Sequence, residues 1–435
     1  MADLNGKRLL IMGGVTKAID IVKTAQEMGV YVLVTDYLTD SPAKKVADES
    51  SMTSTTDVDA VVQLCNDKNV DGVFTGYIDS MLPYCCDVCN KLNLPFYATK
   101  DQIEICIDKE KFKTACNKYG VPTIQEYTLN EDLLEDDLKN IVYPIILKPV
   151  DNSGSRGIFV CHNEEELRTY YPQSLEFSPS KNVIVEQYIE DHEAMIFYMI
   201  QDGKAVLCGL CDRHIQKLEQ NTPPLPIGYY FPSKLTQKYA ESMDEKVVNM
   251  LSSLGMKNGI FSIQSIVKGT DFYFYEVCYR FCGTQAFRFI DKLYNLNPMK
   301  LMINHALTGE MYDEDISTIV SPYYPKHCFV QTILLKDGTI ANIRGVDDIS
   351  NIPEVINVSQ LLKEGVTLAN KAAFTQIALR IYIVADSLKR LSEIISEIQQ
   401  KIDITDTNGE DMIIGMFDTS LLSTETCPTL AGDLM

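Results

Sequence analysis

Residues 148–157, KPVDNSGSRG, combine residue types that bind anions: a lysine, an arginine, two serines and two glycines between two apolar runs. A loop of small residues exposes backbone N–H groups that can converge on phosphate oxygens, and Lys148 and Arg156 would add positive charge. A hairpin turn selects much the same residues, and the spacing is not that of a P-loop. The loop alone therefore leaves both interpretations open.

The first hundred residues alternate between strand-like and helix-like stretches. Residues 7–36 predict a strand, a Gly13-Gly14 turn, a helix and a second strand that ends at Asp36. Further helix and strand patterns follow, as far as a short strand over residues 94–98. Such alternation predicts a parallel sheet covered by helices. Because GGVTKA lacks the full GxGxxG spacing, the turn favours a structural or substrate-facing loop over a dinucleotide site.

From about residue 101 the pattern becomes richer in strands. Segments 194–212 and 259–277 each carry a short turn between strand-like runs, which predicts two antiparallel hairpins. Residues 215–232 are rich in proline and glycine, so we expect a long loop that covers a site. After residue 325 we expect a hairpin around Asp337-Gly338, a strand, and a helix whose apolar face packs on a core.

Acidic residues outnumber basic ones, with 60 Asp and Glu against 39 Lys and Arg, and the formal net charge is −21. This charge repels nucleic acids and anionic membranes, so neither is an expected partner. No apolar run reaches the ~18 residues that span a bilayer, and the first residues lack the apolar stretch of a signal sequence. The thirteen cysteines, including the CxxC spacings at 86–89 and 208–211, are expected to be reduced thiols of a cytoplasmic protein.

Taken together, these segments resemble the ATP-grasp superfamily, and most closely one half of the large subunit of carbamoyl phosphate synthetase. The resemblance rests on Lys109 in a DK pair, on Lys148 before the glycine-rich loop, and on the run from Glu276 to Arg280. It covers roughly residues 1–310. It implies an α/β and α+β fold with three domains: a Rossmann-like pre-ATP-grasp domain (1–100), an ATP-grasp domain (101–310, with a lid at about 110–185) and a small α+β C-terminal domain (311–435).

The resemblance also implies a role for particular residues. Backbone groups near Glu186 and Ile189 would hold the adenine edge, and Glu193 would bind the ribose. Gln264 and Glu276 would bind Mg²⁺ (or Mn²⁺), whereas Cys278 replaces the family's asparagine with a thiol, a poor ligand for a hard cation. The residues implied to bind ATP are Lys109, Lys148, Ser153, Gly154, Ser155, Arg156, Gly157, Glu186, Gln187, Tyr188, Ile189 and Glu193.

The implied activity is that of an ATP-dependent carboxylate–amine ligase acting on small molecules. A carboxylate would attack the γ-phosphate to give an acyl phosphate and ADP, and an amine would then displace phosphate. Lys148 would neutralise the moving phosphoryl group. Arg280 would hold the carboxylate and then stabilise the oxyanion. Arg213 and His214 would line the acceptor site, although an exposed polar role fits them equally well.

Two other functions stay open at this point. An ATP-grasp kinase would stop after phosphoryl transfer, and a nucleotide-binding regulatory protein, suggested by Cys278, would turn over little ATP. A true carbamoyl phosphate synthetase is disfavoured, because the chain has one ATP-grasp module and no glutaminase signature. A homodimer is a further expectation, because dimers are common in families of this kind.

Overall fold

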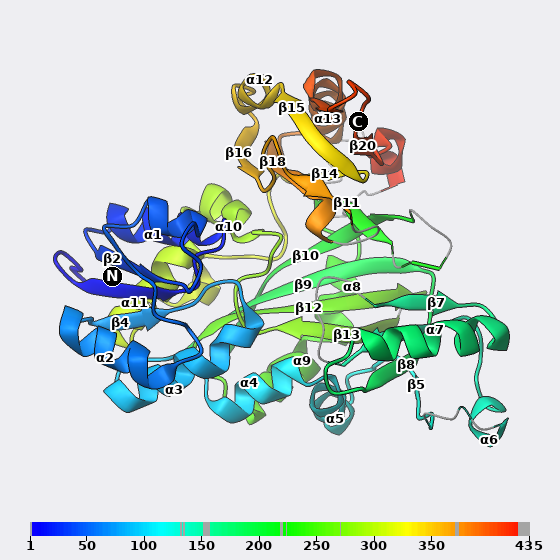
Figure 1. Ribbon diagram of the computed structural model, residues 1–435, viewed down its shortest axis with the longest axis horizontal. Coiled ribbons are helices and arrows are strands. Elements are labelled where there is room, and N and C mark those ends of the chain that lie inside the picture. Colours follow the sequence, from blue (N-terminus) through cyan, green and yellow to red (C-terminus); the bar gives the residue numbers. More distant parts are fainter. Residues whose placement is uncertain are drawn as a thin grey trace.

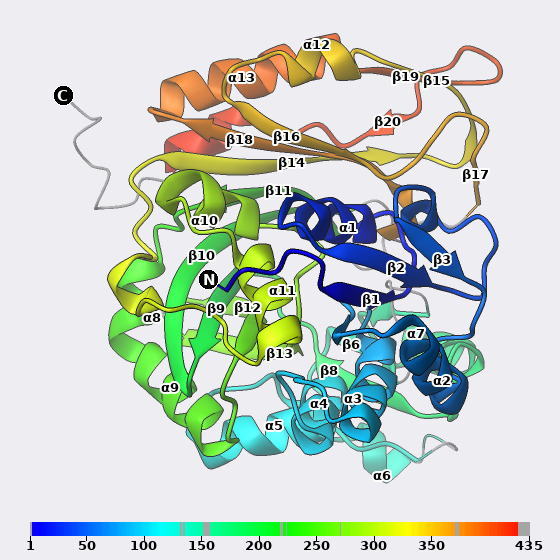
Figure 2. The same cartoon turned by 90° about the vertical axis from the view of Figure 1, so that its left-hand side faces the viewer.

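The computed structural model describes residues 2–130, 133, 135–150, 157–217, 221–222, 224–269, 271–369 and 374–424. A long antiparallel sheet runs through the molecule, with a parallel sheet on one side and a small antiparallel sheet on the other (Figure 1). A layer formed by the C-terminal residues lies over one edge (Figures 1 and 2). The expected class, α/β combined with α+β, is confirmed.

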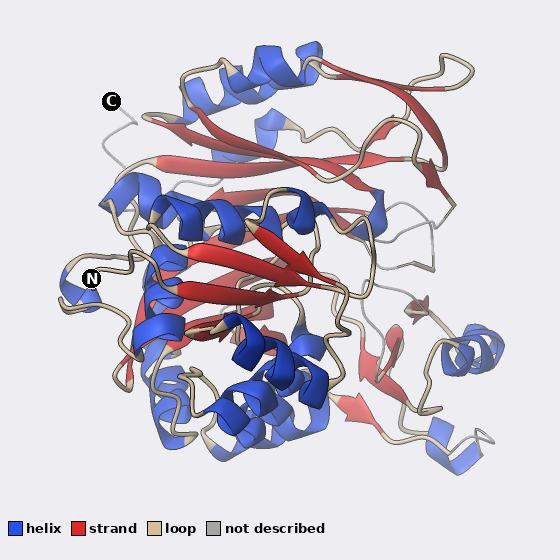
Figure 3. Cartoon of the chain, turned by 60° about the vertical axis from the view of Figure 1, so that its left-hand side comes forward, coloured by secondary structure: helices blue, strands red, loops and turns tan. Residues whose placement is uncertain are grey.

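The N-terminal sheet contains four parallel strands with helices on both faces (Figure 3). Its elements are β1 (Arg8–Met12), α1 (Ala18–Glu27), β2 (Tyr31–Thr35), η1 (Pro42–Lys45), β3 (Glu49–Ser51), α2 (Val58–Lys68), β4 (Gly72–Phe74), η2 (Asp79–Met81), α3 (Leu82–Leu92) and α4 (Lys100–Ile107). The strand order is β3-β2-β1-β4. Because side chains alternate along a strand, Leu9 and Ile11 share a core with α1, and Leu10 and Met12 share one with α2 and α3.

The prediction of a strand over residues 94–98 is wrong. Pro95 lacks a backbone donor, and Tyr97 is directed into the core, where its hydroxyl donates to the Tyr279 carbonyl oxygen at 2.8 Å. The two tyrosine rings also pack edge-on. These contacts hold the segment against residues that follow β13, outside the sheet. The short strand β3 was missed, because its residues are polar and give no apolar run.

The long central sheet is antiparallel throughout. In spatial order its strands are β13 (Asp271–Cys278), β12 (Gly259–Lys268), β9 (His192–Gln201), β10 (Lys204–Gln216), β11 (Leu225–Phe231), β14 (His327–Leu335), β18 (Ile377–Ala385) and β16 (Val355–Gln360), with β20 (Ile413–Ile414) beside β14. The two hairpins predicted from segments 194–212 and 259–277 are confirmed as β9–β10 and β12–β13. The helices that share its main core are α8 (Thr236–Ser242), α9 (Asp244–Ser253), α10 (Phe287–Tyr294) and α11 (Pro298–Thr308).

The long loop expected over residues 215–232 is much shorter than predicted. Strand β10 continues to Gln216 and β11 begins at Leu225, so only residues 217–224 connect them. The aromatic run that ends at Phe231 favours a strand and is fully buried. Pro226 is accommodated where the β10–β11 register shifts after His214, which leaves the ladder locally irregular.

The prediction of a hairpin around Asp337-Gly338 is also wrong. Strand β14 is buried along its whole length between β11 and β18, so no edge is free for the strand that follows it. That strand, β15 (Gly338–Arg344), instead joins a separate sheet with β17 (Thr367–Leu368) and β19 (Asp403–Asp406). The remaining elements of this layer are η3 (Ile316–Thr318), α12 (Val346–Ser350), η4 (Phe374–Gln376), α13 (Leu388–Lys401) and η5 (Thr419–Thr424).

Helix α13 confirms the expected C-terminal helix, because Leu391, Ile395 and Ile398 are buried in one core. Strands β14, β16 and β18 extend the central sheet, so residues on both sides of position 310 share it. The division into three domains therefore stays a prediction.

Within the described residues, no helix has both the length and the hydropathy to cross a bilayer.

The small sheet has its own core and a covering helix. Its elements are α5 (Lys109–Lys118), β5 (Glu126–Tyr127), α6 (Glu135–Leu138), β6 (Ile145–Pro149), β7 (Phe159–Cys161), α7 (Glu164–Glu176) and β8 (Val183–Gln187), and the strand order is β5-β8-β6-β7. Leu167 and Tyr171 of α7 pack with Ile145, Leu147 and Val185 on one face of the sheet. By alternation, Ile146 and Lys148 of β6 lie on the opposite face.

Candidate active site

A pocket lies between the open face of the small sheet and one face of the central sheet. The sequence-predicted residues that line it are Lys109, Lys148, Gln187, Tyr188, Ile189, Glu193, Arg213, Gln264 and Glu276. In the central sheet, Glu193 is in register with Arg213 on one side and with Ile266 on the other, so these side chains share a face. The fold thus gathers residues that are far apart in the sequence.

Part of the pocket wall is apolar. Its apolar residues are Ile124, Ile146, Ile158, Pro224, Ile266 and Phe374. The N–H groups of Gln187 and Tyr188 donate to Gln125 and Pro144 carbonyl oxygens at 2.9 and 2.8 Å, whereas no described residue accepts a hydrogen bond from the N–H of Ile189. An apolar wall beside a free backbone donor suits a planar base.

Glu186 lies behind the pocket wall and binds two lysines. Its side chain, 0% exposed, forms ion pairs with Lys148 and Lys113, and Lys113 also pairs with Glu126 at 2.6 Å. Burial raises the pKa of Glu186, but the two lysines more than offset this and lower it below its ordinary value. Glu186 therefore holds the Lys148 ammonium at the pocket, a contribution of its side chain in addition to the predicted backbone role.

We expect Glu186→Gln to lower the free energy of unfolding by about 3 kcal/mol or more, because it leaves two lysines without their shared buried counter-ion. Since the pKa of Glu186 is lower in the folded state, the stability that it contributes is present above about pH 4.5 and is lost as the pH falls further. Urea unfolding at pH 7 and below pH 4 measures both effects. Glu176→Gln, at an exposed position of α7, is the control. An equal loss at both pH values would contradict this account.

Lys109 provides a second cation at the pocket. Burial lowers its pKa, Glu276 opposes that shift, and Lys148 adds to it, so all three groups lie close enough to interact. The Lys109 ammonium makes no hydrogen bond or ion pair with any described residue, which leaves it available to a ligand. Lys109 and Lys148 together can neutralise a phosphate chain.

A chain of hydrogen bonds joins the predicted ribose and metal positions. Arg213 binds the Glu193 carboxylate and donates to the Tyr275 hydroxyl at 3.0 Å. Tyr275 donates to Gln264 Oε1, and Gln264 Nε2 donates to Glu276 Oε2, both at 3.0 Å. A bulge after Gln264 allows the neighbours Tyr275 and Glu276 both to face the pocket.

The donor set fits one magnesium ion bound together with nucleotide phosphates. The Gln264 amide and the Glu276 carboxylate lie side by side, with Gln264 Nε2 donating to Glu276 Oε2, and a turn of the amide would bring its oxygen next to the carboxylate. Mg²⁺ commonly uses one or two carboxylates plus phosphates and water. No group of three or more His, Cys, Asp or Glu side chains within the described residues could hold a metal alone. Burial raises the pKa of the Cys278 thiol well above its ordinary value, and Cys278 is absent from the pocket lining. Cys278 is thus a buried neutral thiol.

Only part of the loop at residues 148–157 is described. Ser153, Gly154, Ser155 and Arg156 lie outside the described residues. Gly157 is described, and it has φ +74° with a Cβ position only 2.4 Å from Phe177 Cβ, so both its conformation and its packing require glycine. Ser174 of α7 donates to the Gly157 carbonyl oxygen at 2.8 Å. These contacts fix the C-terminal end of the loop on α7.

Two predicted residues lie elsewhere. Arg280 forms a two-point ion pair with Asp79 of η2 and does not line this pocket. His214 packs edge-on against Phe417, and burial lowers its pKa to about 4. Arg213 lies beside Glu193 in the nucleotide pocket, so it and His214 do not form a common acceptor site.

Sequence reasoning missed Tyr275, Lys113 and the apolar wall. Lys113 follows Lys109 by four residues on a helix, a spacing that places both side chains on one face and could have identified it. Tyr275 lies in a strand rich in aromatic residues, and only the bulge turns it into the pocket. The isoleucines of the pocket wall could not be predicted from the sequence, because they come from separate elements and resemble ordinary core residues.

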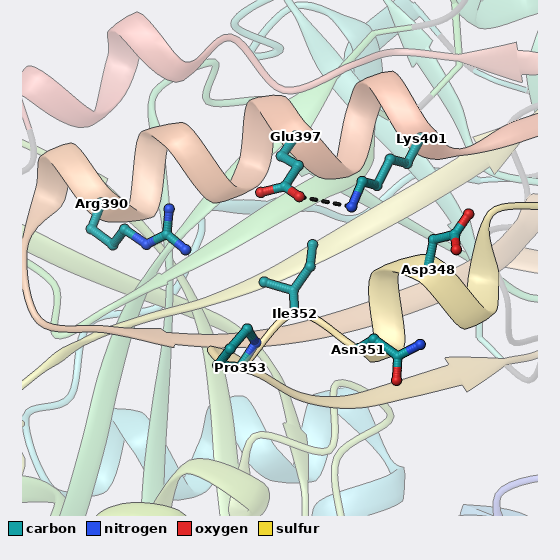
Figure 4. Close-up of a pocket in the computed structure, with 7 residues that line it drawn as sticks. All are labelled: Asp348, Asn351, Ile352, Pro353, Arg390, Glu397 and Lys401. Carbon is teal, nitrogen blue, oxygen red and sulfur yellow. Dashed lines mark ion pairs between the residues drawn. The ribbon is translucent and has the colours of Figure 1, made fainter.

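A second hollow lies between α12 and α13, on the outer layer (Figure 4). Three of its charged residues are paired: Glu397 pairs with Lys401 at 2.8 Å, and Arg390 binds Glu354 at 2.7 Å. This hollow contains none of the predicted site residues. The pocket between the two sheets is therefore the candidate active site.

A pocket between two antiparallel sheets, with two lysines and a carboxylate facing it, is the arrangement typical of the ATP-grasp class of nucleotide-binding proteins. Residues 108–287 match the family described as "Carbamoyl-phosphate synthase L chain, ATP binding domain". A formate-dependent phosphoribosylglycinamide formyltransferase of Sulfurisphaera tokodaii is 28% identical over 281 residues, which cover 62% of this chain and 69% of that protein. A carbamoyl phosphate synthase large chain of Vibrio cholerae is 24% identical over 283 residues, which are 64% of this chain and 25% of that protein.

Solved structures agree on the fold. An L-amino acid ligase from Bacillus licheniformis superposes with a TM-score of 0.76 at 19% identity, covering 93% of this chain and all of that one. The biotin carboxylase domain of a Hydrogenobacter thermophilus 2-oxoglutarate carboxylase, solved with MgADP, gives 0.73 at 19% identity, covering 94% and 91%. Over residues 108–287 the chain thus matches the ATP-binding domain of carbamoyl phosphate synthases, and its fold is that of these solved ligase and carboxylase structures. The family that matches residues 108–287 is an ATP-binding domain, and the Hydrogenobacter thermophilus domain was solved with MgADP.

Proposed function

We propose that the protein is an ADP-forming ligase that joins a small-molecule carboxylate to an amine. The observation that carries the proposal is the pocket between the two sheets, where Lys109, Lys148, Gln264 and Glu276 meet. Its relatives act on small molecules and include a formyltransferase and a carbamoyl phosphate synthase. Phosphoryl transfer requires mainly positioning and charge neutralisation, and this pocket offers both.

Each residue has a definite part in the proposed reaction. Lys148 and Lys109 neutralise the phosphate chain, and Glu193, held by Arg213, accepts hydrogen bonds from the ribose hydroxyls. Gln264 and Glu276 would hold Mg²⁺, which supplies positive charge to the phosphate oxygens. The substrate carboxylate attacks the γ-phosphorus, ADP leaves, and the amine then attacks the acyl carbon of the acyl phosphate and expels phosphate. Gly157 and the residues before it would cover the phosphates.

Incubation with ATP, Mg²⁺ and pooled carboxylates and amines tests this proposal. We expect ADP and free phosphate to appear together only when both a carboxylate and an amine are present, with a product of amide mass. ADP with a phosphorylated product and no free phosphate would contradict the ligase and favour a kinase. Pools that lack one partner serve as controls, because a kinase needs no amine.

Cellular setting and assembly belong to the same proposal. The cysteines of the described residues are all free thiols, and most are buried, which suits a reducing compartment such as the cytoplasm. The similar biotin carboxylase domain was solved as a dimer, which supports a homodimer here. The acidic net charge argues against nucleic acid and anionic membranes as partners.

A further inference from the structure

A second group of charged residues lies where three parts of the chain meet. Lys17 precedes α1, Arg280 follows β13, and Arg380 belongs to β18 of the C-terminal layer. Arg380 Nη1 donates to the Gly283 carbonyl oxygen, which ties β18 to the segment after β13. Figure 1 shows α10 between α1 and the strands of the C-terminal layer.

Acidic partners neutralise only part of this positive charge. Arg280 pairs with Asp79, and Arg288 pairs with Asp20 at 2.6 Å. The Lys17 ammonium has no hydrogen bond or ion pair with any described residue. Arg380 is 4% exposed; its guanidinium donates to the Gly283 carbonyl, and its buried Nε has no partner among the described residues. Two cations are therefore without a counter-ion within the described part of the chain.

These two cations face one point. A β-carbon added to Gly283 would lie 2.9 Å from Lys17 Nζ and 3.9 Å from Arg380 Nη1. Glycine at this position keeps the space between the two nitrogens open. A single anionic group there could accept hydrogen bonds from both, and such charge-assisted bonds are the strong ones.

The positive charge is costly without a ligand. Burial, with smaller contributions from Arg380 and Arg280, lowers the pKa of Lys17 to about 7, while Cys282 opposes the shift. An anion would relieve this repulsion and restore the charged form of Lys17. Unpaired buried charge is rare where it serves no purpose.

The surroundings of the two cations are held rigidly. Gln285 has φ +54°, a left-handed conformation that costs free energy for a residue with a side chain. Its side chain donates to Asp20 at 2.6 Å and accepts from the Ser359 and Tyr382 hydroxyls at 3.0 Å. It therefore links the N-terminal sheet with β16 and β18, and such a preformed frame lowers the cost of binding.

The cation pair lies along the same sheet face as the ATP pocket. Arg213 is in register with Tyr229, Tyr229 with Val330, and Val330 with Tyr382. Arg380 is two residues from Tyr382 and so points to that same face. Arg380 therefore lies on the same sheet face as Arg213, which lines the pocket, with Tyr229 between them.

We propose that Lys17 and Arg380 form an anion subsite that holds a carboxylate or phosphate group of a ligase substrate, separate from the carboxylate that is activated. This inference rests on the proposed function, because it places a substrate beside the ATP pocket. Such a subsite would favour substrates that carry a second anionic group besides the carboxylate that is activated. Gln285 positions the subsite and does not touch the ligand.

Calorimetric titration with inorganic phosphate and with succinate tests the subsite, with Mg²⁺ and a non-hydrolysable ATP analogue filling the nucleotide pocket. We expect one or both probes to bind the native protein, and Lys17→Met to weaken that binding about tenfold or more. Lys23→Met, an exposed lysine on α1, should bind like the native protein. Stronger binding of phosphate would indicate a phosphate monoester, and stronger binding of succinate a second carboxylate.

Equal affinities in the native protein and Lys17→Met, or no binding of either probe, would overturn the subsite. The succinate titration at pH 6.5 and pH 8.5 adds a second readout, since Lys17 loses its proton over this range and affinity should fall as the pH rises. The fall in affinity should vanish in Lys17→Met, because Arg280 and Arg380 keep their charge over this range. It should persist in Cys282→Ser, because that variant retains Lys17. The analogue is titrated separately, so its failure to bind would contradict the ATP site and not the anion subsite.

Discussion

Lys148→Ala should lower the turnover of ATP by about 10²- to 10³-fold, the range found when a preorganised donor to a developing charge is removed. Lys148 lies in the pocket wall, held by the buried Glu186 carboxylate, where the proposed reaction places the phosphates. Because its charge matters most as the γ-phosphoryl group moves, turnover should fall more than ADP affinity. Steady-state ADP release and ADP titration measure the two quantities.

Lys139→Ala is the control, because Lys139 is exposed and pairs only locally with Asp136. It should leave both turnover and ADP affinity unchanged. Thermal unfolding of both variants separates loss of function from loss of fold, since Lys113 still neutralises Glu186 in Lys148→Ala. Native turnover in a folded Lys148→Ala variant would remove Lys148 from the reaction.

Glu276→Gln should reduce turnover by about 10³-fold at ordinary Mg²⁺ concentrations and raise the concentration that is required. The amide keeps the size of the side chain but removes the negative charge that a hard cation prefers. Gln264 would remain as a neutral ligand, so weaker metal binding and not complete loss is the expected result. Turnover measured against Mg²⁺ concentration gives both numbers.

Glu241→Gln provides the matched comparison, since Glu241 is an exposed residue of α8 that bonds only to Gln237. Its Mg²⁺ dependence should match that of the native protein. An unchanged Mg²⁺ requirement in Glu276→Gln would contradict the metal assignment. It would shift attention to the residues before Gly157, which the structure does not describe.

The ATP pocket could be predicted from the sequence because its residues occur in a recognisable order on recognisable elements. Lys109 begins a helix capped by Asp108, Lys148 lies near a strand end, and Gln264 and Glu276 occupy opposing positions of a hairpin whose turn was evident. Local patterns of this kind can be recognised in a single sequence. The placement of Arg280 was less predictable, because its partner Asp79 lies about two hundred residues away.

Errors arose where strand pairing depends on distant segments. The sequence around Asp337-Gly338 contains two strands and a turn, yet β14 has both edges occupied by β11 and β18, which no local pattern records. Lys17 and Arg380 were missed for the same reason. Each looks unremarkable in its own segment, and only Gly283, against which both nitrogens lie, brings them together.

In the proposed reaction, a carboxylate is activated by phosphoryl transfer before it is joined to an amine. Once the pooled assay identifies the carboxylate, the reaction is run with that carboxylate labelled with ¹⁸O at both oxygens. Mass spectrometry of the released phosphate then gives the most direct test. An acyl phosphate route transfers one labelled oxygen to phosphate, whereas release of unlabelled phosphate would contradict it.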